Sequence, residues 1–256
     1  MPRFINIRVI VALMMREMST RYGKSAGGYA WAVLEPLGII AVLTVVFSFV
    51  VRTPALGDSF ALFFATGFIT FHYYMELSQF SAGAVIMNRP LLTYPRVTPI
   101  DTILARALLQ FFTLSVAGAL IFTGIVQVED IRTSYDFEAI LKAVIYASVL
   151  GVGIGATNAV IFAYVPTYQN VYRILTRPLF LISGVFFTFD EMPRLAQDIL
   201  WWNPLIHAVG LMRKGFYPIY DGAYISELYL GGVGVVFLTL GLFLVYSNKT
   251  FLIEQR

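Results

Sequence analysis

Long apolar runs separated by short polar segments dominate the chain. The first uninterrupted run covers residues 31–51. At about 1.5 Å per residue, a helix of this length extends over roughly 31 Å, the thickness of the hydrocarbon core of a membrane. Five later runs are similar, at residues 60–81, 103–126, 139–165, 174–189 and 228–247. The pattern predicts an all-α integral membrane protein with six transmembrane helices.

The fifth run, residues 174–189, is the weakest, because it is short and contains Arg177-Pro178. The proline lacks a backbone donor, so it kinks the helix or starts it. A re-entrant segment is the alternative to a full span here.

The positive charges indicate the orientation. Six spans place both termini on one side of the membrane, and cytoplasmic segments carry an excess of Lys and Arg. Twelve of the 18 cationic residues lie on the side of the termini and six on the other. We therefore expect both termini in the cytoplasm.

Residues 1–30 predict an amphipathic helix in the inner headgroup layer, and their scattered charges exclude a signal peptide. Ile10 and Leu13 fall on the polar side of the helical wheel, so this side is also a candidate surface for docking on a partner. The apolar face holds Phe4, Ile7, Val11, Met14, Met15 and Met18, and the polar face includes Arg3, Arg16, Glu17, Arg21 and Lys24.

The inner loop at residues 82–102 contains three prolines and two arginines, which make it short, stiff and basic. Asp101 is placed to cap the third span. The loop is either a rigid connector or a cytoplasmic handle for a partner protein. The residues of that handle are Arg89, Pro90, Leu91, Tyr94, Pro95 and Arg96.

The outer segment at residues 190–227 is long but strongly apolar. Paired tryptophans favour the headgroup level, and Asn203-Pro204 divides the segment into two short helices. Because irregular backbone at membrane depth must be buried or face water, we expect re-entrant helices at the outer mouth of a pathway. The residues expected at this mouth are Trp201, Trp202, Asn203, Pro204, His207, Arg213 and Lys214.

Composition narrows the chemistry. The chain is 58% hydrophobic and 13% charged, has a mean hydropathy of +0.75, and contains no cysteine and two histidines. Thiolate metal sites, iron–sulfur clusters and cysteine nucleophiles are excluded, and we expect no metal site. The net charge of +3 is explained by the orientation of the chain in the membrane and by contact with anionic lipid, so it does not indicate binding of nucleic acid.

Two glycine-containing motifs resemble functional motifs but lack their sequence context. Gly23-Lys24-Ser25 resembles the end of a phosphate loop, but Met18 stands where that loop requires glycine. Residues 151–155 alternate glycine with Val152 and Ile154 and are interpreted as close helix packing. No hydrolase or intramembrane protease pattern is present.

Ionisable residues within the spans are few. His72 and Glu76 share a face of the second span, as a hydrogen-bonded pair or as a polar contact within a pathway. Glu35, Arg106 and Arg177 lie near inner ends of spans, where we expect them to snorkel to the interface.

Three stretches together resemble the permease subunit of ABC exporters that carry capsular polysaccharide across the bacterial inner membrane. They are RYGKSAGGYAWAVLEP at residues 21–36, NRPLLTYPRVTPIDTILARALLQ at residues 88–110 and WNPLIHAVGLMRKGFYP at residues 202–218. Each motif is moderately specific, and their order and spacing extend the resemblance over nearly the whole chain.

The resemblance implies a homodimer of this permease with two copies of a separate ATPase subunit, which binds ATP and magnesium; no cofactor is expected in this chain. It places the coupling helix on residues 89–99 and the outer gate on residues 192–216. It also implies a lipid-linked acidic polysaccharide as substrate, together with periplasmic and outer-membrane export proteins as further partners.

One departure concerns the gate. The family pattern has acidic residues at the positions of Gly210 and Lys214, and neither is acidic here. The salt bridge that the family pattern implies at the outer mouth is therefore not expected here. Arg213 and Lys214 are expected to remain unopposed, which suits an anionic polymer leaving the channel.

The resemblance and the residues together predict two contact surfaces. Aromatic rings stack on the CH faces of sugars, which favours a channel wall of aromatics on the second and fifth spans. Its candidates are Phe68, Phe71, His72, Tyr73, Tyr74, Phe180, Phe186, Phe187 and Phe189. A basic inner rim, chiefly Arg16, Arg21 and Lys24 with Arg89 and Arg96, is the candidate site for the phosphate of a lipid anchor.

The predicted domain layout is a single transmembrane domain over residues 1–256. It comprises the interface helix at 1–30, spans one to five at 31–189, the gate helices at 190–227, span six at 228–247 and a cytoplasmic tail at 248–256. Alternatives are a permease for O-antigen or teichoic acid, a small-molecule exporter of the same superfamily, and an ion-coupled carrier. The carrier needs deep ionisable residues and repeat symmetry, and the chain offers mainly Glu76.

Overall fold

The computed structural model describes residues 7–21, 27–94 and 96–254, and this part of the chain folds into helices without a strand. Two 3₁₀ turns, η1 (Gly28–Ala30) and η2 (Phe189–Glu191), accompany the α-helices. In chain order these are α1 (Ile7–Arg21), α2 (Trp31–Val50), α3 (Phe60–Met87), α4 (Arg89–Leu92), α5 (Pro99–Val128), α6 (Phe137–Tyr164), α7 (Tyr168–Ile182), α8 (Arg194–Leu200), α9 (Pro204–Phe216), α10 (Glu227–Ser247) and α11 (Lys249–Glu254).

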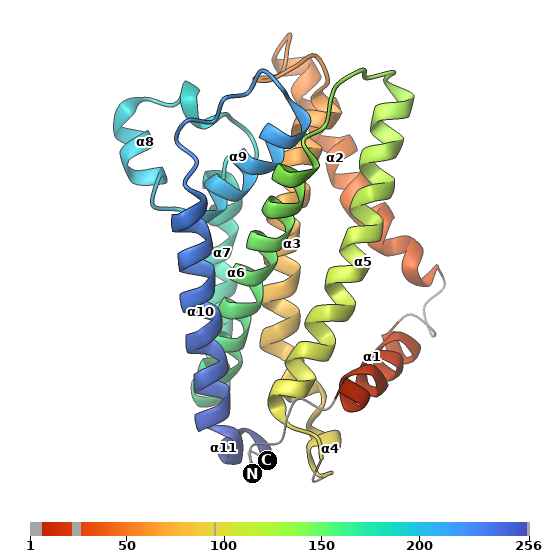
Figure 1. The fold of residues 1–256 in the computed structure, drawn as a ribbon, viewed down its shortest axis with the longest axis vertical. Coiled ribbons are helices and arrows are strands. Elements are labelled where there is room, and N and C mark those ends of the chain that lie inside the picture. Colours follow the sequence, from red (N-terminus) through yellow and green to blue (C-terminus); the bar gives the residue numbers. More distant parts are fainter. Residues whose placement is uncertain (1–6, 22–26, 95, 255–256) are drawn as a thin grey trace.

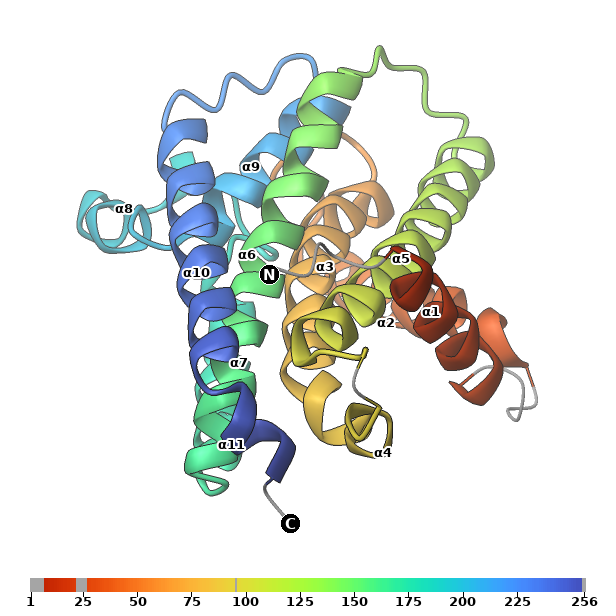
Figure 2. The same cartoon turned by 60° about the horizontal axis from the view of Figure 1, so that its bottom comes forward.

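The long helices run along the longest axis of the molecule, with short helices at both ends (Figure 1). Helices α8 and α9 lie at one end, and α1, α4 and α11 lie towards the other. The view from that second end shows α1 beside α5, with α4 nearby (Figure 2). The two ends of the bundle therefore carry different segments of the chain.

Helix α3 lies at the centre of the bundle. It packs against α6 and α5, and also contacts α2 and α9, while α10 packs against the far side of α6. Its residues from Leu62 to Phe71 are all buried, which its apolar sequence allows on every face. The main apolar core forms around this stretch.

Glycines let α6 approach both neighbours closely. A Cβ atom at Gly151 would lie 2.6 Å from the carbonyl oxygen of Tyr74 in α3, and one at Gly153 would lie 2.5 Å from the backbone nitrogen of Leu238 in α10. Both separations are too short for a side chain, so helix backbones meet there, as they do at small residues in membrane bundles. The interpretation of residues 151–155 as close packing is confirmed.

Four helices of the described part are long and apolar enough to cross a membrane: α2 with η1, α5, α6 and α10. Helix α3 has 28 residues but carries His72, Glu76 and Gln79, and α7 has 15 residues. The all-helical membrane class is confirmed, and the count of six spans stays a prediction.

The predicted boundaries of α7 and the predicted cap of α5 are wrong. The fifth run was expected to form a helix over residues 174–189, but α7 begins six residues earlier at Tyr168 and ends at Ile182, with Pro178 inside it. Asp101 is not the N-cap of α5. Thr98 is, and its hydroxyl accepts from the Asp101 N–H at 3.2 Å while Asp101 Oδ2 accepts from the Thr98 N–H at 2.9 Å. This is a capping box, in which the third helical residue returns the bond.

The outer segment was expected to contain two short helices broken at Asn203-Pro204, and α8 and α9 confirm this. Asn203 caps α9 by accepting the Leu205 N–H at 3.1 Å, and Pro204 takes the first helical position, where no donor is needed. The Asn203 amide also donates to Ile182 O at 3.2 Å, which ties the start of α9 to the end of α7.

Candidate functional site

The predicted coupling segment is a one-turn helix, α4, that follows α3 directly. Leu92 is buried in the apolar cluster at this end, whereas Pro90, Tyr94 and Arg96 are exposed, and Arg89 and Leu91 are partly buried. Pro95 lies outside the described residues. The exposed side chains form a surface that a partner can contact, and Leu92 anchors that surface to the bundle.

Helix α1 is bound to the bundle beside α4 by an ion pair. Arg106 Nε of α5 lies 3.2 Å from Glu17 Oε1, and the two side chains are 5% and 14% exposed. The same guanidinium lies over the Phe80 ring at 4.9 Å and donates to Met87 Sδ at 3.1 Å. The expectation that Arg106 snorkels is wrong, because its charge is held by Glu17 inside the protein.

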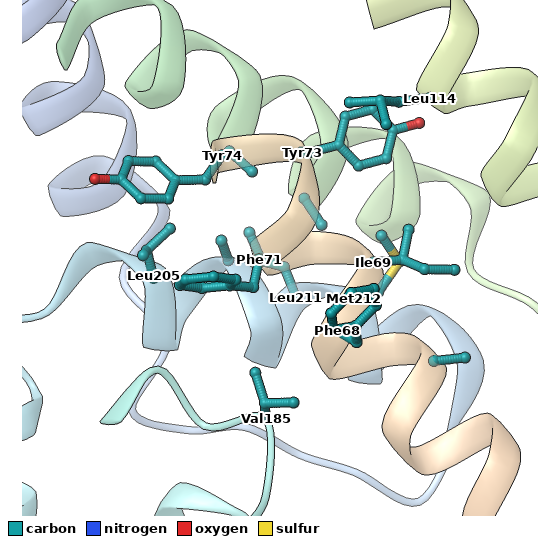
Figure 3. Packing of buried hydrophobic residues seen from close by; sticks show 14 of the residues in the cluster. Phe68, Ile69, Phe71, Tyr73, Tyr74, Leu114, Val185, Leu205, Leu211 and Met212 are labelled. Carbon is teal, nitrogen blue, oxygen red and sulfur yellow. The ribbon is translucent and has the colours of Figure 1, made fainter. Parts of the chain in front are cut away.

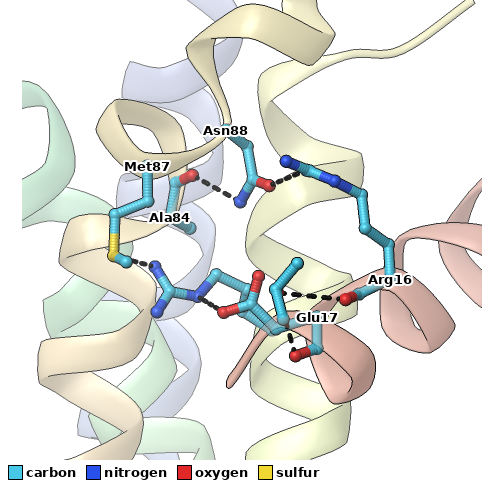
Figure 4. Close-up of polar contacts among 7 residues, drawn as sticks. Arg16, Glu17, Ala84, Met87 and Asn88 are labelled. Atoms are coloured by element: carbon cyan, nitrogen blue, oxygen red, sulfur yellow. Dashed lines mark hydrogen bonds and ion pairs between the residues drawn. The ribbon is translucent and has the colours of Figure 1, made fainter. Parts of the chain in front are cut away.

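A second bond links α1 to the cap of α4 (Figure 4). Arg16 Nη1 donates to Asn88 Oδ1 at 3.2 Å, and Asn88 Nδ2 donates to Ala84 O at 2.9 Å. Ile10, on the same side of α1, is 7% exposed. We call Arg16, Glu17, Asn88 and Arg106 the α1 latch. The polar side of α1 thus docks on its own protein.

The opposite side of α1 is open. Ile7, Val11 and Met15 are 73%, 50% and 62% exposed, as an interfacial helix requires of its apolar face. Of the predicted phosphate-binding rim, Arg16 belongs to the α1 latch, while Lys24 and the side chain of Arg21 lie outside the described residues.

Most of the predicted channel aromatics form one continuous column between α3 and α7. Phe180 of α7 lies 5.2 Å from Phe71 and 6.0 Å from Phe68, measured between ring centroids. Phe186 continues the column at 5.1 Å from Phe180, and the His72 ring stacks on Phe68 at 5.4 Å. We call Phe68, Phe71, Tyr74, Phe180 and Phe186 the aromatic column; Phe68, Phe71 and Tyr74 are buried, so it is packed shut here.

Three of the predicted aromatics lie elsewhere. Tyr73 points away from Tyr74 towards α5 (Figure 3), where its hydroxyl donates to Ser115 Oγ at 3.1 Å. Phe189 stacks on Tyr224 at 4.1 Å in the outer segment. Phe187 contributes its carbonyl to Arg213. Tyr73 and Tyr74 point about 100° apart because they are neighbours on a helix, whereas Phe187 and Phe189 lie beyond the end of α7.

A hydroxyl cluster extends the column towards the start of α7. The Tyr172 hydroxyl lies 2.9 Å from Ser78 Oγ and 3.4 Å from the Tyr74 hydroxyl, and Tyr172 packs on Phe162 of α6. Tyr172 was not among the predicted aromatics, although it stands eight residues before Phe180 on the face of α7 towards α3. Helix α7 is therefore joined to α3 by polar contacts at one end and rings at the other.

Glu76 also lies inside the bundle. Its Oε2 accepts from Gln110 Nε2 of α5 at 2.9 Å. A polar group in a membrane bundle is costly unless hydrogen-bonded. Gln110 joins the functional candidates, and the sequence offered no signal for this partner.

The outer gate is organised around His207, which is fully buried. Its Nδ1 accepts the Ser226 N–H at 3.2 Å, which leaves Nε2 to donate to Trp201 O at 2.8 Å. Burial lowers the pKa of His207, against a smaller opposite effect of the Trp201 bond. The neutral ring therefore joins α9 to the residues before α10.

Arg213 is a structural residue of the gate. It is 1% exposed, donates to Phe187 O at 2.7 Å and Val185 O at 3.4 Å, and lies over the Phe63 ring at 4.3 Å. The hypothesis that it faces a departing polymer is not supported by this placement. Lys214 and Trp202 are exposed and remain available at the outer surface.

The departure at Gly210 has a steric counterpart. A Cβ atom there would collide with the Tyr224 hydroxyl, so Tyr224 fills the space in which the family pattern has an acidic side chain. Burial raises the pKa of Tyr224 well above its ordinary value, and its neutral hydroxyl donates to Ile206 O at 3.4 Å. The gate is thus held by neutral groups around Arg213.

An outer cavity of about 600 Å³ lies between the loops before α3 and α6 and the end of α9. Asp58, Glu129 and Asp130 line it together with Tyr217. Among the described residues, no group of His, Asp and Glu side chains has a metal-binding arrangement.

Residues 8–217 match the family model described as ABC-2 type transporter. Over 240 residues the chain is 33% identical to the polysialic acid transport protein KpsM of Escherichia coli, covering 94% of this chain and 93% of KpsM. It is 29% identical over 238 residues to the capsule polysaccharide export inner-membrane protein BexB of Haemophilus influenzae, covering 93% and 90%. The O-antigen export system permease protein RfbA of Klebsiella pneumoniae is 23% identical over 252 residues, covering 92% and 90%.

Proposed function

The chain belongs to the ABC-2 type transporter family, and we propose that it is the inner-membrane permease subunit of an ATP-driven exporter of lipid-linked acidic capsular polysaccharide. The observation that carries this proposal is the end-to-end similarity to KpsM, named for the transport of polysialic acid. The O-antigen permease is more distant, at 23% identity. Capsular polysaccharide is therefore favoured over O-antigen or teichoic acid.

ATP and magnesium bind on a separate ATPase, of which two copies serve a homodimer of this permease. The absence of a phosphate loop from the sequence supports this division of labour. The exposed side of α4, with Pro90, Tyr94 and Arg96, is the proposed contact with the ATPase. Closure of the ATPase dimer moves α4, and the α1 latch passes that movement to α1 and α5.

In this proposal α3 and α7 complete a set of six spans, with α1, α4 and α11 on the cytoplasmic side and α8 and α9 re-entrant on the outer side. Exposed apolar side chains support a second copy. Helix α2 buries only Pro36 and Ile40, and Ile174 and Leu175 of α7 are 66% and 62% exposed.

The substrate path runs along the aromatic column once α7 separates from α3. Aromatic faces suit sliding sugars because they stack without selecting one residue of the polymer. The anchor phosphate meets the basic rim of Arg16, Arg21 and Lys24 first. At the outer surface, Trp202 and Lys214 meet the emerging chain and the periplasmic and outer-membrane proteins that receive it.

Deletion of the gene tests the proposal most directly. We expect loss of surface capsule and accumulation of polysaccharide in the cytoplasm, measured by immunostaining before and after permeabilisation. Expression of the wild-type chain restores the capsule. Normal surface polysaccharide in the deletion strain would overturn the proposal, and loss of O-antigen alone would favour the alternative.

A further inference from the structure

Helix α7 has three distinct faces. Tyr172, Thr176 and Phe180 are buried or partly buried on the face towards α3. A second, apolar face is open, with Leu175 62% and Ile182 43% exposed.

The third face of α7 is polar and equally open. Gln169, Arg173 and Arg177 are exposed, and their spacing of four residues places them along one stripe of the helix. The ion pairs found in the described residues include neither arginine. We call these three residues the α7 stripe.

The stripe extends into the proposed span. Arg177 stands nine residues after the first residue of α7, about 14 Å along the helix axis. Exposed cations at such a depth are costly against lipid, and in membrane bundles they face the protein interior or water. The open apolar face of the same helix is the one suited to lipid or a second copy.

The stripe also borders the aromatic column, because Phe180 follows Arg177 by three residues. Guanidinium groups bind carboxylate or phosphate bidentately, and aromatic rings bind the CH faces of sugars. The arginines of the stripe therefore suit the acidic group of an acidic sugar, and the rings of the aromatic column suit its CH face.

We propose that the α7 stripe lines an aqueous inner vestibule and binds the carboxylate or phosphate groups of the exported glycan. This rests on the proposed function. Gln169 and Arg173 receive the polymer near the start of α7, and Arg177 passes it to the aromatic column.

Single cysteines test water access, since the chain has none of its own. Cysteine at Gln169, Arg173 or Arg177 should react with a charged, membrane-impermeant thiol reagent at least about tenfold faster than cysteine at Leu175 or Ile182, because only water-facing thiols form the reactive thiolate. The reaction is followed on the assembled complex in nanodiscs. Equal rates on the two faces would overturn the vestibule.

Binding is tested at Gln169→Cys, a variant that keeps both arginines. Oligosialic acid should slow its labelling, and added Arg177→Gln should abolish this protection. Nanodiscs with and without phosphatidylglycerol separate the glycan from a lipid headgroup. Protection by the anionic lipid but not by oligosialic acid would overturn binding of the glycan.

The last test measures export of the polysaccharide by variants of Arg177. Arg177→Lys should keep most surface polysaccharide, whereas Arg177→Gln should reduce it by about tenfold, the effect of losing roughly one charge-assisted contact. Arg52→Gln, an equal loss of charge in an exposed outer loop, is the matched control. Normal export by Arg177→Gln would overturn the stripe alone, whereas a gene deletion without effect on capsule would overturn the proposed function and, with it, the binding of the glycan by the stripe.

Discussion

Single buried polar residues hold the outer gate, and Arg213 is the most demanding of them. A desolvated guanidinium is costly unless hydrogen bonds offset its burial. Here Nη1 and Nη2 donate to the carbonyls of Phe187 and Val185 and the Phe63 ring lies over the guanidinium, whereas the buried Nε has no hydrogen-bond partner among the described residues. These partners belong to the turn after α7 and to α3, so one side chain fixes the position of α9 against both.

Replacing Arg213 with alanine should therefore destabilise the protein. We expect a loss of about 2–4 kcal/mol, since two buried carbonyls lose a partner and a cavity opens. Thermal unfolding in detergent measures the change. Lys214→Ala is the control, because Lys214 is exposed and surface changes stay within about 0.5 kcal/mol. Equal unfolding temperatures for the two variants would show that Arg213 is dispensable.

His207 makes the stability of the gate depend on pH. Because burial depresses the pKa of folded His207, the unfolded chain binds the proton more readily. The contribution of His207 is then complete above the ordinary pKa of about 6.5 and is lost as the pH falls below it. Between pH 7.5 and pH 5.5, wild type should lose more unfolding temperature than His207→Gln. Parallel losses would exclude His207 as the titrating group.

At the scale of elements, the apolar runs predicted most helices but not their ends or their neighbours. Helix α3 continues past the predicted end at residue 81 to Met87, because Ala84 and Val85 are buried in a second apolar cluster at that end of the bundle. The Glu17–Arg106 pair joins residues far apart in sequence. Tyr73 faces α5 and Tyr74 faces α7, so the directions of these two side chains depend on helices that are distant in the sequence. The local sequence pattern does not predict such contacts between distant residues.

The α1 latch gives a test between neighbouring elements. Glu17→Arg and Arg106→Glu should each reduce export strongly, because each leaves a partly buried charge beside a like charge. The double variant should recover much of the loss, with a coupling energy of about 1–3 kcal/mol in the stability cycle. Arg8→Glu, on an exposed position of α1, should have little effect. Additive losses in the double variant would contradict a direct pair.

Packing between α6 and α3 gives a second test. Gly151→Leu should prevent assembly of the bundle, since its Cβ has no room beside Tyr74, and overpacking costs about 1–3 kcal/mol or more. Gly124→Leu is the matched control, because no atom lies within 4 Å of a Cβ there. The amount of monodisperse protein after extraction distinguishes the two. Comparable yields would mean that α6 and α3 separate without penalty.

For the molecule as a whole, transport requires that the packed aromatic column open. Helix α6 meets α3 through backbone at glycines, whereas α7 meets α3 through the tips of side chains: the Tyr172 hydroxyl against Ser78, and the Phe180 ring against Phe68 and Phe71. Contacts between side-chain tips are lost with a small displacement, while interlocked backbones resist one. Helix α7 is therefore the element that we expect to move.

A crosslink between α3 and α7 should then stop export. Ser78→Cys with Tyr172→Cys, joined by a short bifunctional thiol reagent, holds α7 against α3, and a cleavable reagent restores export on reduction. The control joins Tyr73→Cys and Ser115→Cys across α3 and α5, a pair equally close at 3.1 Å but outside the column. If both crosslinks leave export intact, the polymer does not pass between α3 and α7. If both stop it, α5 moves as well, and the column alone does not form the path.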